Sequence, residues 1–293
     1  MHALDDFREI IAKGERLAPH TWFRIGGPAE YVARPRNADE AGALVRRCRE
    51  ADLPIRVLGG GSNVLIRDEG VAGVVIHLQS PAFSDVRVDG RLVEAGAAVP
   101  LTALISQTAR LGLAGLEVLT GIPGTLGGAV RGNSGGRHGT IGTAVRSATV
   151  LDSAGEIQVR DRDDLDFARR EGSFDGLAIL SAGLELETED PESVVRRMRK
   201  IWIVKKENQP YGHESSGCIF KSPGPDVAAS ALIDQAGLRG ARVGGAEVSE
   251  RHANYIVARR GATSEDVFRL IDQIRDRVRT RSGYELALQI EVW

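Results

Sequence analysis

The sequence predicts an α+β protein made of about two domains. Its 293 residues can bury a large core, and chains of this length commonly divide in two. Strand-like runs alternate with helical patterns in the first third of the chain. The middle is rich in strand-like runs and holds one helical pattern, a distribution that is typical of the α+β class.

The first third is predicted to contain two strands around one helix. Residues 30–34 have a strand pattern, and residues 37–40, Asn-Ala-Asp-Glu, resemble a capping box at the start of a helix. Pro54 ends that helix, and residues 55–58 form a candidate buried strand. The buried face of the helix is predicted to consist of Ala41, Leu44, Val45 and Cys48. The pattern therefore predicts that Cys48 lies in a core.

The middle of the chain is predicted to be mostly strands. Several short strand-like runs lie between residues 71 and 98, and Pro100 then opens a helix that Gly112 stops. The inward face of this helix is predicted to hold Leu101, Leu104, Ile105 and Leu111. A glycine-rich segment, residues 121–136, follows, and strand patterns resume in ATVLD, EIQVRD and LAILSAGLELE.

Two long helices are predicted in the last third. The first has Asp190 as its N-cap, Pro191 at its first position and a basic end at Lys205-Lys206. Its apolar face is predicted to hold Val194, Val195, Met198, Ile201 and Trp202. The second runs from residue 263 or 264 to about 281, with inward residues Val267, Leu270, Ile271, Ile274 and Val278. We place the domain boundary between these helices, near residue 205.

Composition excludes several classes of protein. The net charge of −2 and the pI of about 6.3 favour neither nucleic acid nor an anionic membrane as a partner. Two cysteines supply neither a disulfide framework nor a zinc pair, and the six histidines lack metal-ligand spacing, so no metal site is predicted. The acidic start of the chain is unlike a signal peptide, and no run approaches the roughly 18 apolar residues of a membrane helix. The sequence predicts a cytosolic globular protein.

Glycine is the one unusual component, at 35 of 293 residues. Two glycine-rich loops, residues 59–63 and 121–136, offer backbone N–H groups that suit a pyrophosphate and a flat cofactor, although tight turns also explain such loops. Residues 132–136 match the G-x-S-x-G pattern of a nucleophile elbow. That motif requires a strand before it and a helix after it, and a glycine-rich loop precedes it here. We therefore reject a serine nucleophile at this position.

Two polar segments near the C-terminus remain open to several interpretations. Cys218, in ESSGCIFKSP, suits a core hydrophobe, a nucleophile, a metal ligand or a proton donor. Arginine, histidine and asparagine beside glycine turns, in VGGAEVSERHANYIV, suit a phosphate-bearing ligand or a solvated loop. The residues alone do not decide between these alternatives.

Five segments together resemble one known family. They are TWFRIGGPAEY, LGGGSNVLIRDEG, GIPGTLGGAVRGN, SSGCIFKSP and LIDQAGLRGARVGGAEVSERHANYIV, in this order. This order resembles the MurB family, the UDP-N-acetylenolpyruvoylglucosamine reductases of peptidoglycan synthesis. The resemblance runs from Thr21 to the C-terminus, and the chain looks like the shorter of the family's two types.

The resemblance implies an FAD-binding fold of the p-cresol methylhydroxylase type followed by an α+β substrate-binding domain. The FAD-binding domain would be residues 1–204, with subdomains at about 1–68 and 69–204, and the C-terminal domain residues 205–293. NADPH is implied as the reductant. The residues that match the family's FAD-binding segments are Gly59, Gly60, Gly61, Ser62, Asn63, Pro123, Gly124, Thr125, Gly127, Gly128 and Asn133.

The family reaction implies the roles of three catalytic residues. Hydride from the flavin reaches C3 of the enolpyruvyl group, charge develops on the carboxylate, and C2 must receive a proton. Arg170 matches the arginine that stabilises this charge. Cys218 stands where the family usually has a serine proton donor, and a thiol with an unperturbed pKa of about 8.5 is mostly protonated at neutral pH. Gln289 occupies the family's glutamate position in an ungapped alignment, with Glu291 as a register alternative.

The resemblance also implies the substrate contacts and three departures from the family pattern. The predicted substrate-binding residues are Lys206, Lys221, Ser222, Arg251, His252 and Asn254. Arg169 replaces a tyrosine, Gly172 a serine and Ser222 an asparagine.

We therefore predict a cytoplasmic, monomeric UDP-N-acetylmuramate dehydrogenase of cell wall biogenesis, cell shape and cell division, with no nucleic acid or membrane partner. A different flavin oxidoreductase and a non-catalytic sugar-nucleotide or flavin-binding protein remain the alternatives.

Overall fold

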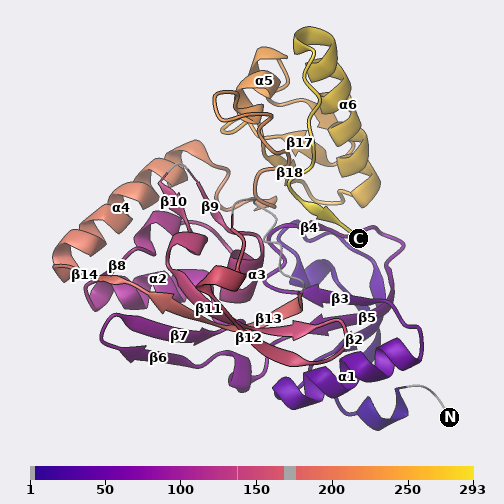
Figure 1. The fold of residues 1–293 in the computed structure, drawn as a ribbon. Coiled ribbons are helices and arrows are strands. Elements are labelled where there is room, and N and C mark those ends of the chain that lie inside the picture. The colour runs from indigo at the N-terminus through magenta and orange to yellow at the C-terminus, as the bar shows by residue number, and fades with distance from the viewer. Residues whose placement is uncertain (1–3, 137, 168–175) are drawn as a thin grey trace. The chain divides into compact units, whose positions relative to one another are not determined.

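The computed structural model describes residues 4–136, 138–167 and 176–293 (Figure 1). By its internal contacts the chain divides into two compact units. Unit 1 comprises Met1–Lys13, Tyr31–Gly60 and Ala72–Ile203, and unit 2 comprises Gly14–Glu30, Gly61–Val71 and Val204–Trp293. Each unit is therefore built from three separate segments of the sequence. The mixed helix and strand content agrees with the predicted α+β class.

Unit 1 contains a five-stranded antiparallel sheet in the order β12-β11-β13-β7-β6 (Figure 1). Its strands are β12 (Ile157–Asp161), β11 (Val145–Asp152), β13 (Gly176–Glu185), β7 (Leu92–Gly96) and β6 (Val86–Asp89). These are the strand patterns that the sequence predicts in the middle of the chain, and all are confirmed. Two short antiparallel pairs accompany the sheet: β14 (Glu187–Thr188) with β8 (Leu113–Ala114), and β10 (Gly139–Thr140) with β9 (Gly135–Gly136).

A second sheet has the order β1-β2-β5-β3. Its strands are β1 (Ile11–Arg16), β2 (Pro28–Ala33), β5 (Val71–His77) and β3 (Ile55–Leu58), and β3 pairs with β5 in parallel. Helix α1 (Ala38–Glu50) lies between β2 and β3 in the chain, as predicted.

The start of α1 differs in detail from a capping box. The Asn37 side chain accepts the Glu40 N–H at 2.9 Å, as predicted. The Glu40 carboxylate instead accepts the backbone N–H of Arg36 at 2.6 Å and lies 2.7 Å from the Arg36 guanidinium. The arginine one position before the cap attracts the carboxylate, so the reciprocal bond reaches Arg36 rather than Asn37.

The predicted buried faces in unit 1 are mostly confirmed. Cys48 on α1 is fully buried, and burial raises the pKa of its thiol to about 11, which suits a structural role. In α2 (Leu101–Arg110), Leu101, Leu104 and Ile105 are buried. Leu111 is 54% exposed, so its predicted burial was wrong. The helix ends one residue earlier, because Gly112 adopts a positive φ of 72° there.

Helix α4 (Pro191–Asn208) begins as predicted, since the Asp190 carboxylate accepts the Ser193 N–H at 2.9 Å. Its predicted apolar face is only partly buried. Val194 packs in a small core with Ala109 and Ala114, but Trp202 is 41% exposed. The helix also continues past residue 205, where the sequence suggested a domain boundary. The division into an FAD-binding and a substrate-binding domain stays a prediction.

Unit 2 contains a four-stranded sheet in the order β15-β18-β17-β16. Its strands are β15 (Glu214–Ser215), β18 (Ile256–Ala258), β17 (Ala246–Val248) and β16 (Arg242–Val243), and a parallel pair joins β4 (Val64–Leu65) to β19 (Glu291–Val292). Its helices are α5 (Ala229–Gln235) and α6 (Ser264–Ser282). The prediction for α6 is confirmed, because Thr263 and Asp266 form a capping box and all five predicted inward residues are buried.

The glycine-rich segment 121–136 contains a short helix, α3 (Leu126–Arg131), which the sequence did not predict. Ser134 follows this helix and precedes the β9–β10 hairpin. A nucleophile elbow needs the opposite context, a strand before and a helix after. Residues 132–136 therefore do not form a nucleophile elbow.

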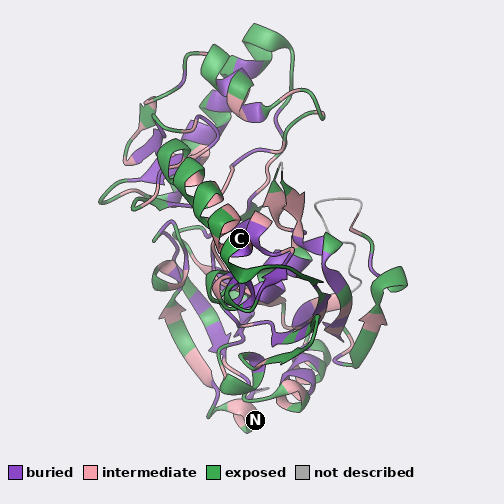
Figure 2. Ribbon diagram, turned by 90° about the vertical axis from the view of Figure 1, so that its left-hand side faces the viewer, coloured by how far each residue is buried: buried purple, intermediate pink, exposed green. Residues whose placement is uncertain are grey.

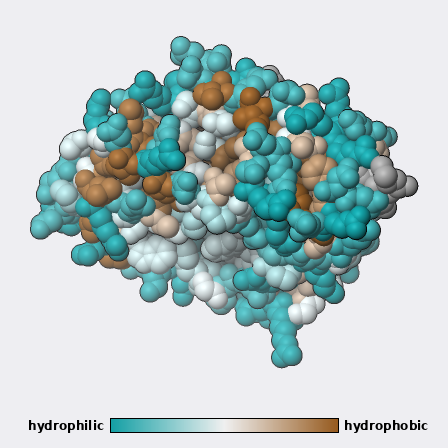
Figure 3. Space-filling model, turned by 90° about the horizontal axis from the view of Figure 1, so that it is seen from below, coloured by the Kyte–Doolittle hydropathy of each residue, from teal (hydrophilic) through white to brown (hydrophobic). Residues whose placement is uncertain are grey.

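Buried positions alternate with exposed ones along many of the strands and helices (Figure 2). On the face drawn in Figure 3, hydrophobic side chains form separate patches among hydrophilic ones. Within the ranges that the structure describes, every helix is too short or too polar to span a bilayer.

Candidate functional site

The two glycine loops meet within unit 1. Gly59 and Gly60 follow strand β3, and a Cβ added at Gly60 would lie 2.6 Å from the Cα of Gly124. The carbonyl of Gly124 in turn accepts the N–H of Leu101 at 3.0 Å, and Thr125 forms a β-bridge with Pro100. Backbone therefore packs directly on backbone, and only glycine permits this approach. Two segments that the sequence predicts to bind one cofactor are adjacent.

Gly127 and Gly128 of helix α3 differ in the space that surrounds them. A Cβ at Gly127 would lie 2.7 Å from the Cβ of Ala97, so the fold itself needs this glycine. Gly128 is exposed, and among the described residues a Cβ there would meet only Thr125 Oγ1, at 3.7 Å. The space in front of Gly128 therefore stays open. A flat cofactor lying close to this backbone fits the loops as they stand.

The Asn133 side chain holds two neighbouring segments together by hydrogen bonds. It is 5% exposed and adopts a positive φ of 39°. Its side chain accepts the Gly142 N–H at 3.1 Å and donates to the Phe167 carbonyl at 2.8 Å. These bonds fix two segments that line an open cavity of about 580 Å³, whose lining residues are Thr140, Gly142, Thr143, Arg162, Asp163, Leu165, Asp166 and Phe167. Arg170, the predicted partner of the substrate carboxylate, lies outside the described residues.

Unit 2 brings together predicted cofactor and catalytic residues that are far apart in the sequence. The Ser62 carbonyl accepts the Gly217 N–H at 3.2 Å, next to Cys218. The Asn63 side chain donates to the Gln289 carbonyl at 3.1 Å. Gln289 N–H in turn donates to the Ile219 carbonyl at 2.7 Å. Three segments around Ser62, Cys218 and Gln289 are thus held together by hydrogen bonds.

Gln289 and its register alternative Glu291 lie in different surroundings. Gln289 is opposite Ile219, in a short antiparallel contact that includes the Phe220–Leu288 bridge. Its side-chain oxygen is buried and has no hydrogen-bond partner among the described residues. Glu291 is exposed in β19, and its carboxylate accepts the indole N–H of Trp293 at 3.3 Å. Gln289, rather than Glu291, therefore lies in the segment beside the thiol.

The surroundings of Cys218 include two side chains that sequence reasoning did not assign to it. Electrostatic effects link Cys218 to Tyr255 and to Lys205. Burial raises the pKa of Tyr255 far above its ordinary value, and Cys218 and Tyr211 add to this shift. Burial lowers the pKa of Lys205, an effect that Cys218 opposes. Tyr255 is part of the quoted HANYIV run, but nothing local in the sequence indicates that its segment lies beside that of Cys218.

His252 and Asn254 stabilise the same region. The His252 ring contacts Tyr255 edge to face, with centroids 4.9 Å apart, and burial followed by the charge of Arg239 lowers the pKa of His252. Asn254 is buried and pairs with Phe220 on both sides: its amide oxygen accepts at 3.0 Å and its amide nitrogen donates at 2.9 Å. Its main-chain carbonyl also accepts the Ile219 N–H at 2.9 Å. Asn254 thus fixes the segment that carries the thiol.

The remaining predicted substrate residues are also in unit 2. Arg251 donates to the Lys206 carbonyl at 3.2 Å, and both side chains are exposed. The Lys221 N–H donates to the Ala287 carbonyl at 2.8 Å. The Ser222 hydroxyl accepts the Ala229 N–H at 3.3 Å, at the start of α5.

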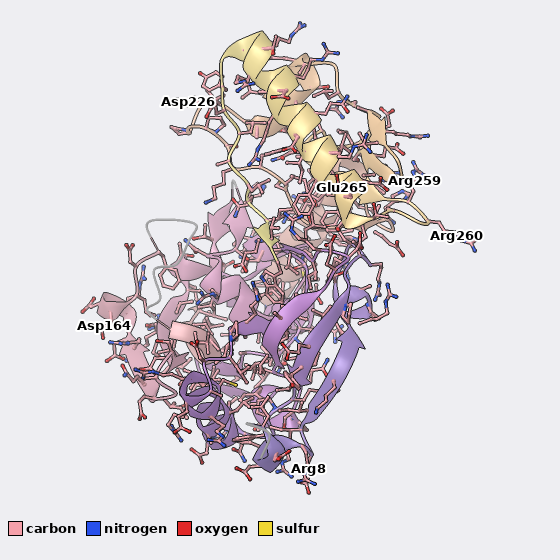
Figure 4. All side chains as sticks on the ribbon, turned by 90° about the vertical axis from the view of Figure 1, so that its right-hand side faces the viewer. Arg8, Asp164, Asp226, Arg259, Arg260 and Glu265 are labelled. Atoms are coloured by element: carbon pink, nitrogen blue, oxygen red, sulfur yellow. The ribbon has the colours of Figure 1, made fainter. Side chains whose placement is uncertain are left out.

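One charged cluster of unit 2 is structural. Arg259 and Glu265 come from the segment before α6 and from its first turn, and both are labelled in Figure 4. Arg259 is 2.6 Å from the buried Glu247 carboxylate, which also pairs with Arg242 at 2.9 Å. The arginines neutralise a carboxylate that burial would otherwise destabilise. Asp226, also labelled in Figure 4, belongs to the exposed segment before α5.

Family models, relatives and a solved structure match this chain. Residues 29–160 match the family model described as an FAD binding domain, and residues 209–293 match the C-terminal domain of UDP-N-acetylenolpyruvoylglucosamine reductase. The reductase of Heliobacterium modesticaldum is 41% identical over 98% of this chain and 92% of its own length. That of Bradyrhizobium sp. (strain ORS 278) is 38% identical, over 99% and 94%. The crystal structure of MurB from Thermus caldophilus aligns with a TM-score of 0.83 and 36% identity, over 96% of this chain and 99% of that one.

The match to the FAD binding domain model and the fold shared with MurB define an FAD-binding flavoprotein, and the p-cresol methylhydroxylase type of its fold stays a prediction. The chain belongs to the UDP-N-acetylenolpyruvoylglucosamine reductase family, since its identity with family members extends over nearly its whole length. The resemblance predicted from the sequence is confirmed.

Proposed function

We propose that the chain catalyses the FAD-dependent reduction of UDP-N-acetylenolpyruvoylglucosamine to UDP-N-acetylmuramate with NADPH, in the synthesis of peptidoglycan precursors. One observation carries this proposal for a chain of this family. Hydrogen bonds join the segments of Ser62, Cys218 and Gln289, so a predicted cofactor loop and two predicted catalytic residues are adjacent. If Cys218 were only a core residue, it would not need to lie beside a cofactor loop and a second catalytic residue.

The backbone of the glycine loops is proposed to hold FAD. Gly59, Gly60, Gly124 and Gly128 carry no side chain that would keep a cofactor away from their backbone, and Gly128 leaves open space. Gly61, Ser62 and Asn63 of unit 2 are the further proposed cofactor contacts. FAD, when bound, supplies the hydride for C3 of the enolpyruvyl group.

Cys218 is proposed to donate the proton that C2 must receive. Its thiol is half-buried, and its segment is fixed by the bonds from Asn254 and Gln289. A fixed donor avoids part of the entropic cost of aligning the proton with its acceptor. Arg170 is proposed to hold the substrate carboxylate and to stabilise the charge that develops on it.

Gln289 is proposed to orient a group at the reaction centre without transferring a proton. An amide oxygen accepts hydrogen bonds but carries no ionisable proton. The buried oxygen of Gln289, which has no partner within residues 4–136, 138–167 and 176–293, provides such an acceptor beside the thiol segment.

The substrate is proposed to bind through the exposed cationic side chains of Lys206 and Arg251, with Lys221, Ser222, His252 and Asn254 as further contacts. Cationic side chains suit the phosphates of a sugar nucleotide. We further propose a cytoplasmic monomer with roles in cell wall biogenesis, cell shape and cell division, and without nucleic acid or membrane partners.

Replacement of Cys218 tests the proposal. In anaerobic stopped-flow experiments, Cys218→Ala should be reduced by NADPH almost as fast as the wild type, because that half of the reaction needs no proton from the thiol. Reoxidation by the enolpyruvyl sugar nucleotide should slow by about 10²–10⁴-fold, the usual contribution of a positioned acid. Cys218→Ser, which keeps a proton on the side chain, should retain more of the second step.

Two outcomes contradict the proposal. Equal slowing of both half-reactions in Cys218→Ala would refute the role of the thiol as proton donor. A wild-type protein that binds the sugar nucleotide but is never reoxidised by it would be a binding protein instead of a reductase.

A further inference from the structure

A buried carboxylate, that of Glu117, lies just before the glycine-rich segment 121–136. Glu117 begins the short 3₁₀ helix η4 (Glu117–Leu119) and is 6% exposed. One of its carboxylate oxygens accepts the Gly115 N–H at 2.6 Å. The other accepts two N–H groups of the Arg197 guanidinium, at 3.0 and 3.1 Å. The carboxylate therefore joins the turn before η4 to helix α4, on which Arg197 lies.

Arg197 extends this connection to a third segment of unit 1. Its guanidinium also donates to both carboxylate oxygens of Glu189, at 2.7 and 3.0 Å. Glu189 is exposed and follows strand β14. The planar guanidinium is thus held by two carboxylates, and Glu189 fixes it in the orientation in which it meets the buried Glu117.

Helix η4 supports both ends of the glycine-rich segment. At the start of the segment, the Glu117 carbonyl accepts the N–H and the hydroxyl of Thr120, at 3.1 and 2.7 Å. The Leu119 carbonyl accepts the Ile122 N–H at 2.9 Å. At the end of the segment, η4 packs against strands β9 and β10. A movement of η4 would therefore displace both ends of the segment that is proposed to hold FAD.

A carboxylate is not needed merely to fill the space at Glu117. Burial of a charge costs free energy, and apolar side chains of similar volume are often as stable as a buried ion pair or more so. A carboxylate differs from them because its hydrogen bonds have fixed directions and fixed partners. Residues that support a cofactor site have to keep it in one geometry, and directional bonds serve this purpose.

We propose that Glu117 and Arg197 are positioning residues for the FAD site, which hold η4, and through it the glycine-rich segment 121–136, in the arrangement that binds the flavin. The two side chains act through this backbone and not by contact with FAD. This inference rests on the proposed function, which places FAD beside residues 123–128.

Binding of FAD to the flavin-free protein tests the inference without turnover. Glu117→Gln keeps the shape of the side chain and an acceptor for the Gly115 N–H but loses the charge that holds Arg197. Its dissociation constant for FAD, measured by quenching of flavin fluorescence, should rise about tenfold, because charge-assisted hydrogen bonds become neutral ones. Arg197→Met should raise the constant at least as much. Arg197→Lys keeps the charge but not the planar guanidinium, so its constant should lie between those of Arg197→Met and the wild type.

Glu247→Gln is the matched control for a purely structural role. Glu247 is 4% exposed and pairs with Arg242 and Arg259, but it belongs to β17 of unit 2. Loss of its charge should lower the urea midpoint and leave the dissociation constant for FAD unchanged, because a protein that stays folded keeps an intact site. Unchanged constants in Glu117→Gln and Arg197→Met would overturn the inference, as would an equal rise in Glu247→Gln. If Glu117→Gln does not fold, Arg197→Lys decides, and an affinity equal to that of the wild type would overturn the inference.

The FAD titration and the turnover experiment separate this inference from the proposed function. A wild type that binds FAD but is never reoxidised by the enolpyruvyl sugar nucleotide would refute the proposed function and leave the order of FAD affinities as it is. Normal turnover of the wild type, with unchanged FAD affinity in Glu117→Gln and Arg197→Met, would refute only the role of this pair.

Discussion

The glycine loops of unit 1 and the thiol cluster of unit 2 are built in opposite ways. Around Gly60 and Gly124 the backbone packs on the backbone, and the absence of side chains creates the surface. Around Cys218, electrostatic effects link the thiol to Lys205 and Tyr255, and a backbone hydrogen bond holds the segment of Gln289 beside it. The first region depends on shape, and the second depends on charge and on hydrogen bonds.

This difference shows how each region should respond to change. A single methyl group disturbs a backbone contact but leaves its electrostatics almost unaltered. Loss of one polar atom from the thiol cluster leaves its shape nearly intact but changes the energy of an ionised group. Steric substitutions should therefore act mainly in unit 1, and pH should act mainly in unit 2.

The largest expected effect is a steric one at Gly60. Gly60→Ala places a Cβ 2.6 Å from the Cα of Gly124, and backbone must move to accommodate it. Overpacking of this kind costs about 1–3 kcal/mol, so we expect a lower urea midpoint and weaker retention of FAD. The urea midpoint and the flavin content of the purified protein measure the two effects.

Gly136, in the second glycine-rich loop, supplies the control for Gly60→Ala. It is exposed, and no described atom beyond its chain neighbours lies within 4 Å of a Cβ placed there. Gly136→Ala should therefore be stable and keep its FAD. Equal behaviour of the two variants would refute the claim that contact between the loops requires glycine.

Much of the fold was predictable because its signals are local. The spacing of apolar residues in α1 and α6 is set by the helix alone, and the predicted faces are buried in both. The end of α4 was less predictable, because burial of Trp202 depends on what packs against it and not on its helical spacing. The helix α3 was missed for a similar reason, since glycines at 127 and 128 disfavour a helix by propensity, whereas Gly127 fits close packing against Ala97.

The candidate site was predictable only in part. Glycine loops and the thiol are visible in the sequence, but their association depends on tertiary contacts that join residues 62, 217 and 289. The segment of Tyr255 lies beside the segment of Cys218 because Asn254 is bonded to Ile219 and Phe220, and that pairing has no sequence signature. The partners of a reactive group are therefore harder to predict than the group itself.

A second steric substitution, Gly128→Ala, should raise stability and lower the affinity for FAD. Gly128→Ala fits within helix α3 without a clash, and alanine favours a helix over glycine by about 0.8–1 kcal/mol. The variant without FAD should therefore unfold at a higher urea concentration than the wild type. Its affinity for FAD should fall about tenfold, because the methyl group fills the open space in front of Gly128.

Affinity is measured by flavin fluorescence quenching, and stability by urea denaturation of the flavin-free protein. A Gly128→Ala protein that binds FAD as tightly as the wild type would remove Gly128 from the cofactor site. A lower urea midpoint would contradict the open space seen at this position.

The smallest expected effect is electrostatic and belongs to unit 2. Burial and the nearby Arg239 lower the pKa of His252 below its ordinary value of 6.5, so the folded state binds its proton less readily than the unfolded state does. The free energy of unfolding is therefore unaffected by this group above pH 6.5 and falls as the pH is lowered from there toward the folded-state pKa. The slope for one histidine is at most about 1.4 kcal/mol per pH unit.

His252→Gln should thus lose less stability than the wild type between pH 7.5 and 5.5 in urea denaturation, while His213→Gln, at an exposed position, should follow the wild type. Parallel curves for all three proteins would show that the surroundings of Tyr255 tolerate a charged imidazole, and the contrast with the glycine loops would then rest on Cys218 and Lys205 alone.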